Sequence, residues 1–291
     1  MGTDPNLFWH NGDRPRWMQM GTDPDGCKRK GNAMKVVILA GGYGTRISEE
    51  SYLKPKPMIE IGEKPILWHI MKGYSARGYN EFIICCGYKQ HIIKEWFADY
   101  YLYNSDVTFD FTRENQMTVH NNESEPWKVT LVDTGLDTMT GGRIKRVQKY
   151  VGDDEMFMLT YGDAVSDVNP DDILKYHKSH GKLATVTAIS VDQRFGVLDM
   201  NDTNAITSFR EKQMSDNSRI SGGFMVLDKK VFDYIEGDST VFEKGPMMQL
   251  AKEGNLMGYR YDGFWQCMDT KREMDKLEEM WKSGKAPWKV W

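Results

Sequence analysis

The sequence has few cysteines, no long hydrophobic run and no excess of basic residues, and each shortage excludes a class of protein. Its longest unbroken apolar run, residues 36–40, is far shorter than the roughly 20 residues that a membrane-spanning helix needs. The four cysteines show neither a CxxC pair nor a disulfide-dense pattern, so we expect a reducing cytoplasm. A net charge of -4 disfavours a nucleic-acid coat protein, which would present a basic face. Any anionic substrate must therefore be met by local cations.

The first 33 residues differ from the rest of the chain. The string MGTDP at residues 1–5 recurs at residues 20–24, and the segment lacks the apolar region of a secretory signal. We therefore expect residues 1–33 to be a disordered leader or extension and residues 34–291 to form one domain.

Hydrophobic periodicity after residue 34 predicts an α/β fold. Buried runs at residues 36–40, 82–86 and around 157–160 alternate with glycine loops and helical patterns, which indicates a mainly parallel, Rossmann-like sheet flanked by helices. Helices are predicted over residues 66–76 and 92–101, where apolar side chains recur at helical spacing.

Strand patterns dominate two later regions. Alternating residues between 106 and 134 suggest strands of an antiparallel insertion. From residue 184 onward, short strands separated by turns predict a smaller mixed β lobe. Residues 269–282 predict a charged helix, after which Trp288 and Trp291 either dock a partner or fold back on the core.

The sequence GGYGTR at residues 41–46 follows a buried strand and is typical of a phosphate cradle. Glycines let backbone N–H groups approach an anion closely, and Arg46 adds a cation. The Walker motif requires Lys and Ser or Thr where Arg46 and Ile47 stand, and the dinucleotide motif requires a glycine in place of Ile47. Without further signals, a plain glycine turn between strand and helix explains the pattern equally well.

The sequence KPKP at residues 54–57 holds two lysines on a stiff extended arm, because each lysine precedes a proline. Transfer between two repelling phosphates needs fixed cations at the α-phosphorus, and Lys56 fits that need together with Arg46. A solvated basic loop is the alternative.

Asp163 and Asp269 are the candidate metal ligands. Asp163 follows a buried run, which places it at the carboxyl end of a strand, where open α/β sheets bind ligands. An ordinary Gly-Asp turn is the alternative for Asp163, and an N-cap of the following helix is the alternative for Asp269.

The strings GGxGTR and PKPM at residues 41–46 and 55–58 together resemble the signature of sugar-1-phosphate nucleotidylyltransferases, and the resemblance covers essentially all of residues 34–291. LVDTG, MTGGR and GFWQ, which begin at residues 131, 139 and 263, look most like the cytidylyltransferase branch, which uses CTP and glucose 1-phosphate. The resemblance implies a nucleotide-diphospho-sugar transferase fold with a nucleotide-binding part at 34–180, a sugar-binding part at 181–268 and a C-terminal helix and tail at 269–291. It also implies Mg²⁺ as cofactor, CTP and glucose 1-phosphate as substrates, and a homo-oligomer.

The resemblance assigns roles to individual positions. Arg46, Lys56, Asp163 and Asp269 become catalytic, and Asp163 and Asp269 hold Mg²⁺. Ala164 and Cys267 depart from residues common in relatives, but neither removes a ligand. The nucleotide-binding set is Leu39, Ala40, Gly41, Gly42, Gly44, Thr45, Arg46, Lys56, Thr138 and Arg143.

The predicted sugar site comes from the later strands. The resemblance assigns Glu211 to sugar hydroxyls and Lys212 to the sugar phosphate, roles that a carboxylate and an ammonium can fill. Gly196 and Gly223 would leave room for a pyranose ring. An exposed Glu-Lys ion pair and ordinary turn glycines are the alternatives.

Three rival interpretations stay open at this point. The base could be uracil or thymine, which differ from cytosine at the edge that a protein reads. The chain could be a catalytically silent nucleotide-sugar-binding regulatory protein, or a nucleotide-sugar glycosyltransferase, which would not need the glycine loop with the lysine arm.

Overall fold

The structure is a computed structural model that describes residues 34–44, 53–113, 116–190, 197–200, 206–210 and 219–291. The predicted leader, residues 1–33, therefore lies outside the described residues, as do Thr45, Arg46, Gly196, Glu211 and Lys212.

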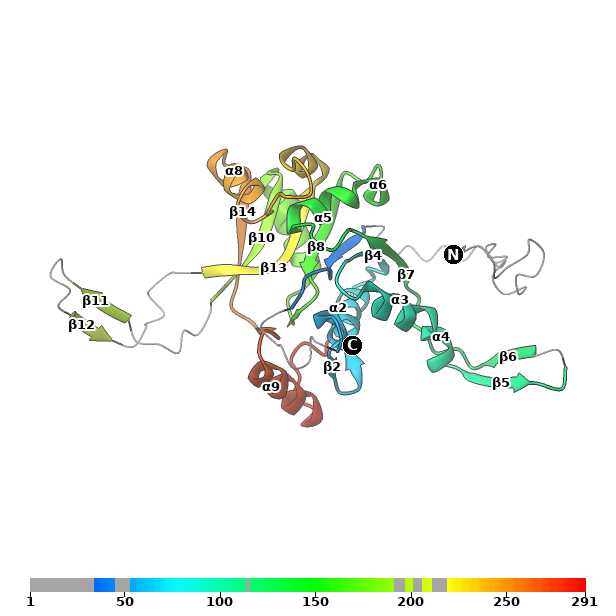
Figure 1. The fold of residues 1–291 in the computed structure, drawn as a ribbon. Coiled ribbons are helices and arrows are strands. Elements are labelled where there is room, and N and C mark those ends of the chain that lie inside the picture. Colours follow the sequence, from blue (N-terminus) through cyan, green and yellow to red (C-terminus); the bar gives the residue numbers. More distant parts are fainter. Residues whose placement is uncertain (1–33, 45–52, 114–115, 191–196, 201–205, 211–218) are drawn as a thin grey trace, which may run out of the picture. The chain divides into compact units, whose positions relative to one another are not determined.

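A mixed, mostly parallel sheet forms the centre of the domain (Figure 1). Seven described strands pair in the order β14-β10-β13-β8-β1-β4-β7. All neighbours are parallel except at β13, which is antiparallel to both β8 and β10. The bounds are β1 Val36–Leu39, β4 Glu81–Cys86, β7 Lys128–Asp133, β8 Met156–Tyr161, β10 Ala184–Ser190, β13 Arg219–Asp228 and β14 Leu256–Tyr261.

Helices cover both faces of this sheet, because successive residues of β1 point to opposite sides and each side needs its own core. One core cluster contains Val36 and Ile38, and the other contains Val37 and Leu39. The helices α2 Ile66–Ser75, α3 Gln90–Ala98, α7 Pro170–His180 and α9 Lys271–Lys282 contribute to the first cluster. The helices α5 Thr140–Arg146, α6 Gln148–Val151 and α8 Pro246–Lys252, with the 3-10 helix η3 Lys229–Tyr234, contribute to the second.

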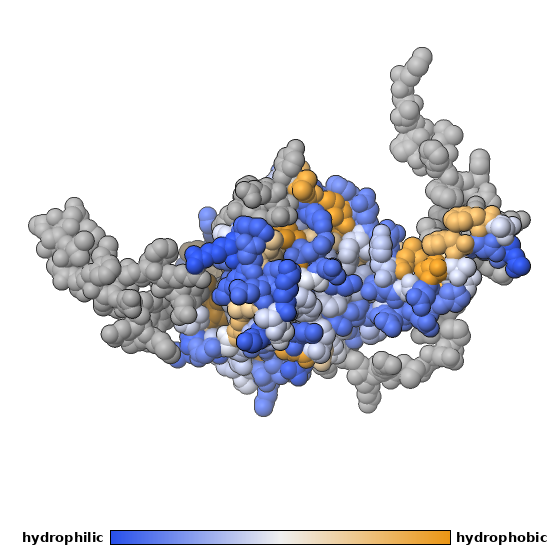
Figure 2. Space-filling model, turned by 90° about the horizontal axis from the view of Figure 1, so that it is seen from below, coloured by the Kyte–Doolittle hydropathy of each residue, from blue (hydrophilic) through white to orange (hydrophobic). Residues whose placement is uncertain are grey.

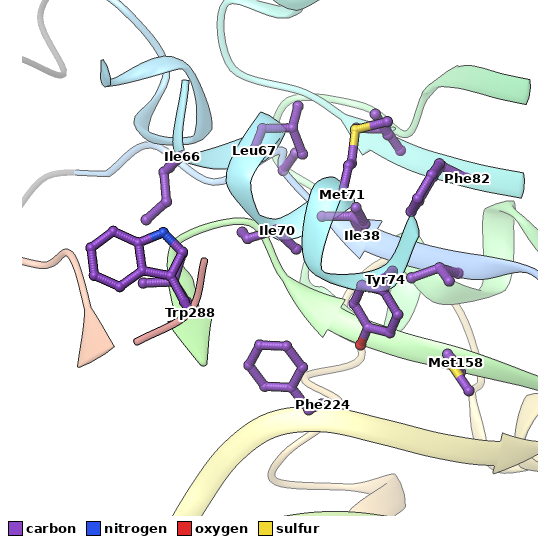
Figure 3. Packing of buried hydrophobic residues seen from close by; sticks show 14 of the residues in the cluster. Ile38, Ile66, Leu67, Ile70, Met71, Tyr74, Phe82, Met158, Phe224 and Trp288 are labelled. Carbon is purple, nitrogen blue, oxygen red and sulfur yellow. The ribbon is translucent and has the colours of Figure 1, made fainter. Parts of the chain in front are cut away.

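Helix α2 shows how the predicted periodicity becomes packing. Its apolar stripe at Ile70, Met71 and Tyr74 faces Ile38 of β1 and Phe82 of β4 (Figure 3). The expected helix over 66–76 is thereby confirmed. The expected helix over 92–101 is instead two helices, α3 and α4 Tyr100–Tyr103, which are separated at Asp99.

The later strands differ in arrangement from the prediction. Between residues 106 and 134, β5 Asp106–Asp110 and β6 Gln116–His120 form an antiparallel hairpin, but β7 joins the central sheet in parallel. Strands β10, β13 and β14 also extend the central sheet, so the mixed character expected after residue 184 does not require a second large sheet. The hairpin of β11 Val197–Met200 and β12 Ile206–Arg210 pairs separately.

Two other short pairings position the site. Strands β2 Glu60–Ile61 and β3 Lys64–Pro65 form a tight hairpin after the 3-10 helix η2 Lys56–Met58. Strand β15 Trp265–Cys267 pairs with β9 Ala164–Ser166 and so brings the end of the domain beside the end of β8.

The C-terminal tail folds back on the core, which settles the two alternatives for its tryptophans. The Trp288 side chain is buried, and its ring lies 6.2 Å from the ring of His69, while Trp291 packs against Trp68. Burial lowers the pKa of His69 to about 4, so its ring is neutral. Its Nε2–H can donate to the Ile61 carbonyl oxygen while Nδ1 accepts from the Trp288 indole N–H.

The surface of the described part is mostly hydrophilic in the view of Figure 2, with hydrophobic residues in separate groups. The β5–β6 hairpin carries exposed Phe109 and Phe111, whose rings stack with centroids 6.3 Å apart. Among the residues that the structure describes, none of the helices combines the length and the apolar character that crossing a bilayer requires.

Candidate active site

A cleft of about 590 Å³ opens where β1 and β8 end, and the loop after β7 forms another of its walls. The carboxyl ends of parallel strands meet at one edge of a sheet, so segments far apart in sequence converge there. The cleft is lined by Leu39, Ala40, Gly41, Gly42, Tyr43, Gly44, Lys56, Pro57, Leu136, Asp137, Thr138, Met139, Thr140, Arg143, Tyr161, Gly162, Asp163 and Asp269. All predicted nucleotide-binding and catalytic residues that the structure describes are in this set.

Two positions of the turn that lines the cleft favour glycine for steric reasons. A Cβ atom on Gly41 would stand 2.2 Å from Nη1 of Arg143, so a side chain there would displace the guanidinium. Gly44 has a φ of +66°, a left-handed conformation that favours glycine. The turn predicted from GGYGTR is described as far as Gly44, and its residues line the cleft.

Arg143 is buried behind the turn rather than extended across the cleft. Its Nη1 donates to the Thr134 hydroxyl at 2.8 Å and to the Gly135 carbonyl at 2.7 Å, and its Nη2 donates to the Leu136 carbonyl at 3.0 Å. Burial lowers the pKa of Arg143, although a guanidinium stays charged. Arg143 therefore fixes the loop after β7, a role that the sequence did not indicate.

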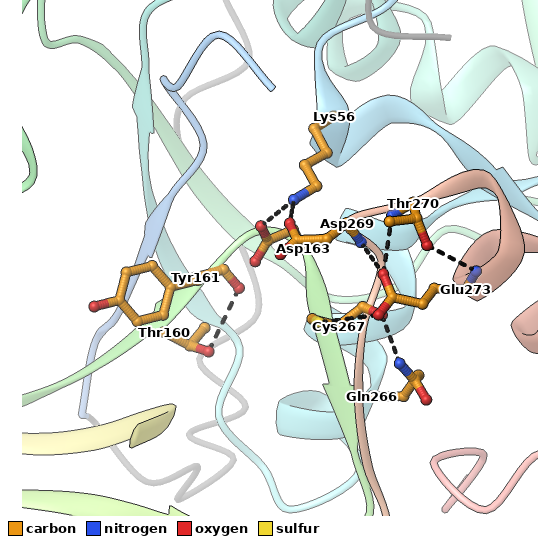
Figure 4. A network of polar contacts seen from close by, with 9 residues as sticks. All are labelled: Lys56, Thr160, Tyr161, Asp163, Gln266, Cys267, Asp269, Thr270 and Glu273. Carbon is orange, nitrogen blue, oxygen red and sulfur yellow. Dashed lines mark hydrogen bonds and ion pairs between the residues drawn. The ribbon is translucent and has the colours of Figure 1, made fainter. Parts of the chain in front are cut away.

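Among the described residues, Lys56 is a cation that lines the cleft beside Asp163 and Asp269. The extended arm predicted from KPKP ends at Pro55, whose ψ is 145°. Lys56 itself begins the 3-10 helix η2, in which the Met58 N–H donates to the Pro55 carbonyl, so the predicted extended conformation is wrong for Lys56. The Lys56 side chain is buried, and its Nζ lies 2.7 Å from Oδ2 of Asp163 and is also hydrogen-bonded to Asp269 (Figure 4). Lys54, by contrast, forms an exposed ion pair with Glu60.

The electrostatics of Lys56 favour its charged form. Burial by itself lowers the pKa of an ammonium, but the charge and hydrogen bonds of Asp163, followed by those of Asp269, outweigh it. The pKa of Lys56 is therefore raised above the ordinary lysine value. Its ammonium is therefore positive at neutral pH.

Backbone hydrogen bonds of neighbouring residues fix the chain at Asp163 and Asp269. The Gly162 N–H donates to the Leu39 carbonyl at 2.9 Å, and the Met268 N–H donates to the Asp163 carbonyl at 2.8 Å. Asp269 is not the N-cap of α9; that position belongs to Thr270, which forms a capping box with Glu273. Asp269 instead lines the cleft, where its carboxylate pairs with Lys56.

The two carboxylates fit a magnesium ion in number and kind. Their side chains retain 31% and 26% of their exposure, so each has oxygen surface that faces solvent or ligand. Magnesium commonly takes one or two protein carboxylates and completes its shell with phosphate oxygens and waters. Within the described ranges, no group of three or more His, Cys, Asp and Glu side chains could hold a metal, so this pair would depend on the substrate.

Another polar network lies at the cleft, and the sequence did not predict it. Glu243 accepts hydrogen bonds from the Tyr161 phenol and from the Thr140 hydroxyl. Tyr161 immediately precedes the Gly-Asp turn, but Glu243 is 82 residues away and belongs to no motif. Glu243 itself does not line the cleft, but the tertiary fold brings it behind Tyr161 and Thr140, which do.

The expected sugar site is described only at Gly223. This glycine has a φ of +77°, and a Cβ atom on it would lie 3.0 Å from Cδ2 of Tyr161. Its missing side chain therefore makes room for the Tyr161 ring, and Gly223 is not among the residues that line the cleft. The other sugar-binding predictions, Gly196, Glu211 and Lys212, fall outside the described residues.

A glycine turn, a buried lysine and two convergent carboxylates at the edge of this α/β sheet define an enzyme class that acts on nucleoside phosphates. The chain belongs to the nucleotidyl transferase family, whose model matches residues 35–266. It is 56% identical over 258 residues to the glucose-1-phosphate cytidylyltransferase of Salmonella typhimurium, which covers 89% of this chain and 100% of that protein. It is 48% identical over 260 residues to the probable glucose-1-phosphate cytidylyltransferase of Bacillus subtilis, with the same coverage.

Solved structures support the fold. HddC from Yersinia pseudotuberculosis matches 85% of this chain and 99% of that chain with a TM-score of 0.60 at 23% identity. The sugar-1-phosphate nucleotidylyltransferase resemblance and the predicted fold class are therefore confirmed.

Proposed function

We propose that this protein transfers a cytidylyl group from CTP to α-D-glucose 1-phosphate, giving CDP-glucose and pyrophosphate. The observation that carries the reaction type is the convergence of Lys56 with Asp163 and Asp269 in a cleft beside the glycine turn. The observation that favours CTP and glucose 1-phosphate is the 56% identity to a glucose-1-phosphate cytidylyltransferase over that protein's whole length.

The chemistry is a direct displacement at the α-phosphorus. An oxygen of the sugar phosphate attacks, the new P–O bond forms, and the bond to the β-phosphate breaks with its electron pair leaving on pyrophosphate. No general base is needed, because a phosphate oxygen is already ionised at neutral pH. The Lys56 ammonium offsets the negative charge that accumulates on the transferring group, and Arg46 is the second cation of the proposal.

Asp163 and Asp269 would hold Mg²⁺, which when bound neutralises phosphate oxygens and orients the triphosphate. Both carboxylates pair with Lys56. Their pairing keeps the ammonium and the two anionic groups at one point of the cleft, so the charges that the reaction needs are already assembled.

The substrate contacts of the proposal follow the cleft. The base would be read by backbone groups of Leu39 and Ala40 with Thr138, while Arg143 holds the loop that carries Thr138. The phosphates would lie on Gly41, Gly42, Gly44 and Thr45. For the sugar, Gly196, Glu211 and Lys212 remain the proposed contacts, while Gly223 would contribute indirectly by making room for the Tyr161 ring, which lines the cleft. A cytoplasmic location and a homo-oligomer remain parts of the proposal.

The function is tested by supplying each triphosphate in turn. We expect pyrophosphate release from CTP with glucose 1-phosphate and Mg²⁺, and release at least about tenfold slower with UTP or dTTP, because the edges of those bases exchange donors and acceptors. If only UTP or dTTP gave pyrophosphate, the enzyme would be specific for uracil or thymine and not for cytosine. No release with any triphosphate would favour the regulatory protein that binds nucleotide sugars without catalysis.

A further inference from the structure

Tyr43 and Asp137 form a hydrogen bond between two walls of the cleft. The Tyr43 phenol donates to Oδ1 of Asp137 at 2.7 Å, although the two residues are 94 positions apart. Tyr43 belongs to the glycine turn after β1, and Asp137 belongs to the loop that joins β7 to α5. Both line the cleft, so the bond links the segments that we assign to the nucleotide.

The same two segments are also joined at their base. The buried Arg143 guanidinium donates to the carbonyls of Gly135 and Leu136, and it lies so close to Gly41 that a Cβ atom there would clash with it. The backbone on both walls is thus fixed near the sheet. Farther along each segment, the bond between Tyr43 and Asp137 provides the cross-link.

Tyr43 is also supported from the side. Its ring centroid lies 5.3 Å from that of Tyr88, whose N–H donates to the Gly41 carbonyl at 3.1 Å. The hydrogen bond to Asp137 raises the pKa of Tyr43, so the phenol keeps its proton and remains the donor at neutral pH. A tyrosine that is 44% exposed is therefore held in one place by two neighbours.

We propose that Tyr43 and Asp137 are positioning residues that hold the glycine turn and the loop of residues 134–139 at the spacing the nucleotide requires. The proposal rests on the proposed function, because it places the nucleotide in this cleft. When the two loops are already ordered, binding of the nucleotide loses no free energy to ordering them. The link therefore strengthens binding without contacting the reacting atoms. Losing the link should therefore weaken nucleotide binding and leave the chemical step unchanged.

The test compares Tyr43→Phe and Asp137→Ala with the parent protein. For each variant we expect the KM for CTP to rise about three- to tenfold, which is the usual worth of one such hydrogen bond. The kcat and the KM for glucose 1-phosphate should stay within about twofold. Because the two side chains act through one bond, the double variant should be no weaker than the worse single variant.

Two further variants separate positioning from a general loss of structure. Asp137→Asn keeps an acceptor oxygen and should recover most of the affinity that Asp137→Ala loses. Tyr234→Phe removes a similar hydrogen bond, from Tyr234 to Glu253 at 2.6 Å, on a part of the surface that does not line the cleft. Its kinetic constants should equal those of the parent.

A KM for CTP that is unchanged or lower in Tyr43→Phe would overturn the proposal, since the bond would then be neutral or act as a barrier to entry. A fall in kcat at unchanged KM would also overturn it. If the parent releases pyrophosphate with CTP and the variants match it, the positioning role alone fails. If the parent neither turns over nor binds CTP, the proposed function fails and the positioning role fails with it.

Discussion

Replacing Lys56 by alanine should lower kcat for pyrophosphate release by about 10²- to 10³-fold, the usual effect of removing one group that stabilises transition-state charge. The Lys56 ammonium is the described cation that contacts both Asp163 and Asp269, and its burial makes water a poor substitute. Steady-state kinetics with saturating CTP and glucose 1-phosphate measure the effect.

Lys54→Ala is the matched control for this experiment. Lys54 lies on the same Lys-Pro arm, but its ammonium pairs with Glu60 at the surface, where both side chains are almost half exposed. Its loss should change kcat by less than about twofold, because exposed ion pairs contribute little. Circular dichroism should show both variants folded, since Asp163 and Asp269 keep enough exposure to be solvated. Equal rates for Lys56→Ala and the parent would remove Lys56 from the mechanism.

Asp269→Asn should lower kcat by about 10²- to 10³-fold and shift activation to a higher Mg²⁺ concentration. The change keeps the size of the side chain but removes one of the two negative charges beside Lys56. A titration of pyrophosphate release against Mg²⁺ measures both effects. Asp163→Asn should behave in the same way, because its carboxylate stands in the same pair.

Asp275→Asn provides the control for the aspartate variants. Asp275 lies on α9, a short distance along the chain from Asp269, but its carboxylate pairs with Lys271 at the surface. Its Mg²⁺ dependence should match that of the parent. If Asp269→Asn also kept the parent's Mg²⁺ dependence, the metal would not bind at this carboxylate.

Much of the site was predictable because its signals are local. The glycine turn follows β1 directly, the lysine arm is a contiguous string, and Asp163 follows β8. Parallel strands place such strand ends at one edge of a sheet, so local position in the sequence predicts a shared location. Helical periodicity, which is also a local signal, predicted the apolar face of α2 at Ile70, Met71 and Tyr74.

The contacts that the sequence could not predict join distant segments. Arg143 carries a charge that suggested contact with a base, but its donors reach three positions in the loop after β7, which no periodicity reveals. Glu243 meets Tyr161 and Thr140 only because the chain after η3 returns to α5. Strand order is likewise nonlocal, so the sequence predicted the mixed character of the strands after residue 184 but not that β10, β13 and β14 continue the central sheet.

The stereochemistry at the α-phosphorus tests most directly whether a single displacement takes place between Lys56 and the two carboxylates. CTP that carries sulfur on the α-phosphorus in one configuration can be reacted with glucose 1-phosphate, and phosphorus NMR of the sulfur-labelled product reports the configuration. One in-line displacement predicts inversion. Retention would require two displacements through a covalent intermediate on the protein, and it would contradict direct attack by the sugar phosphate.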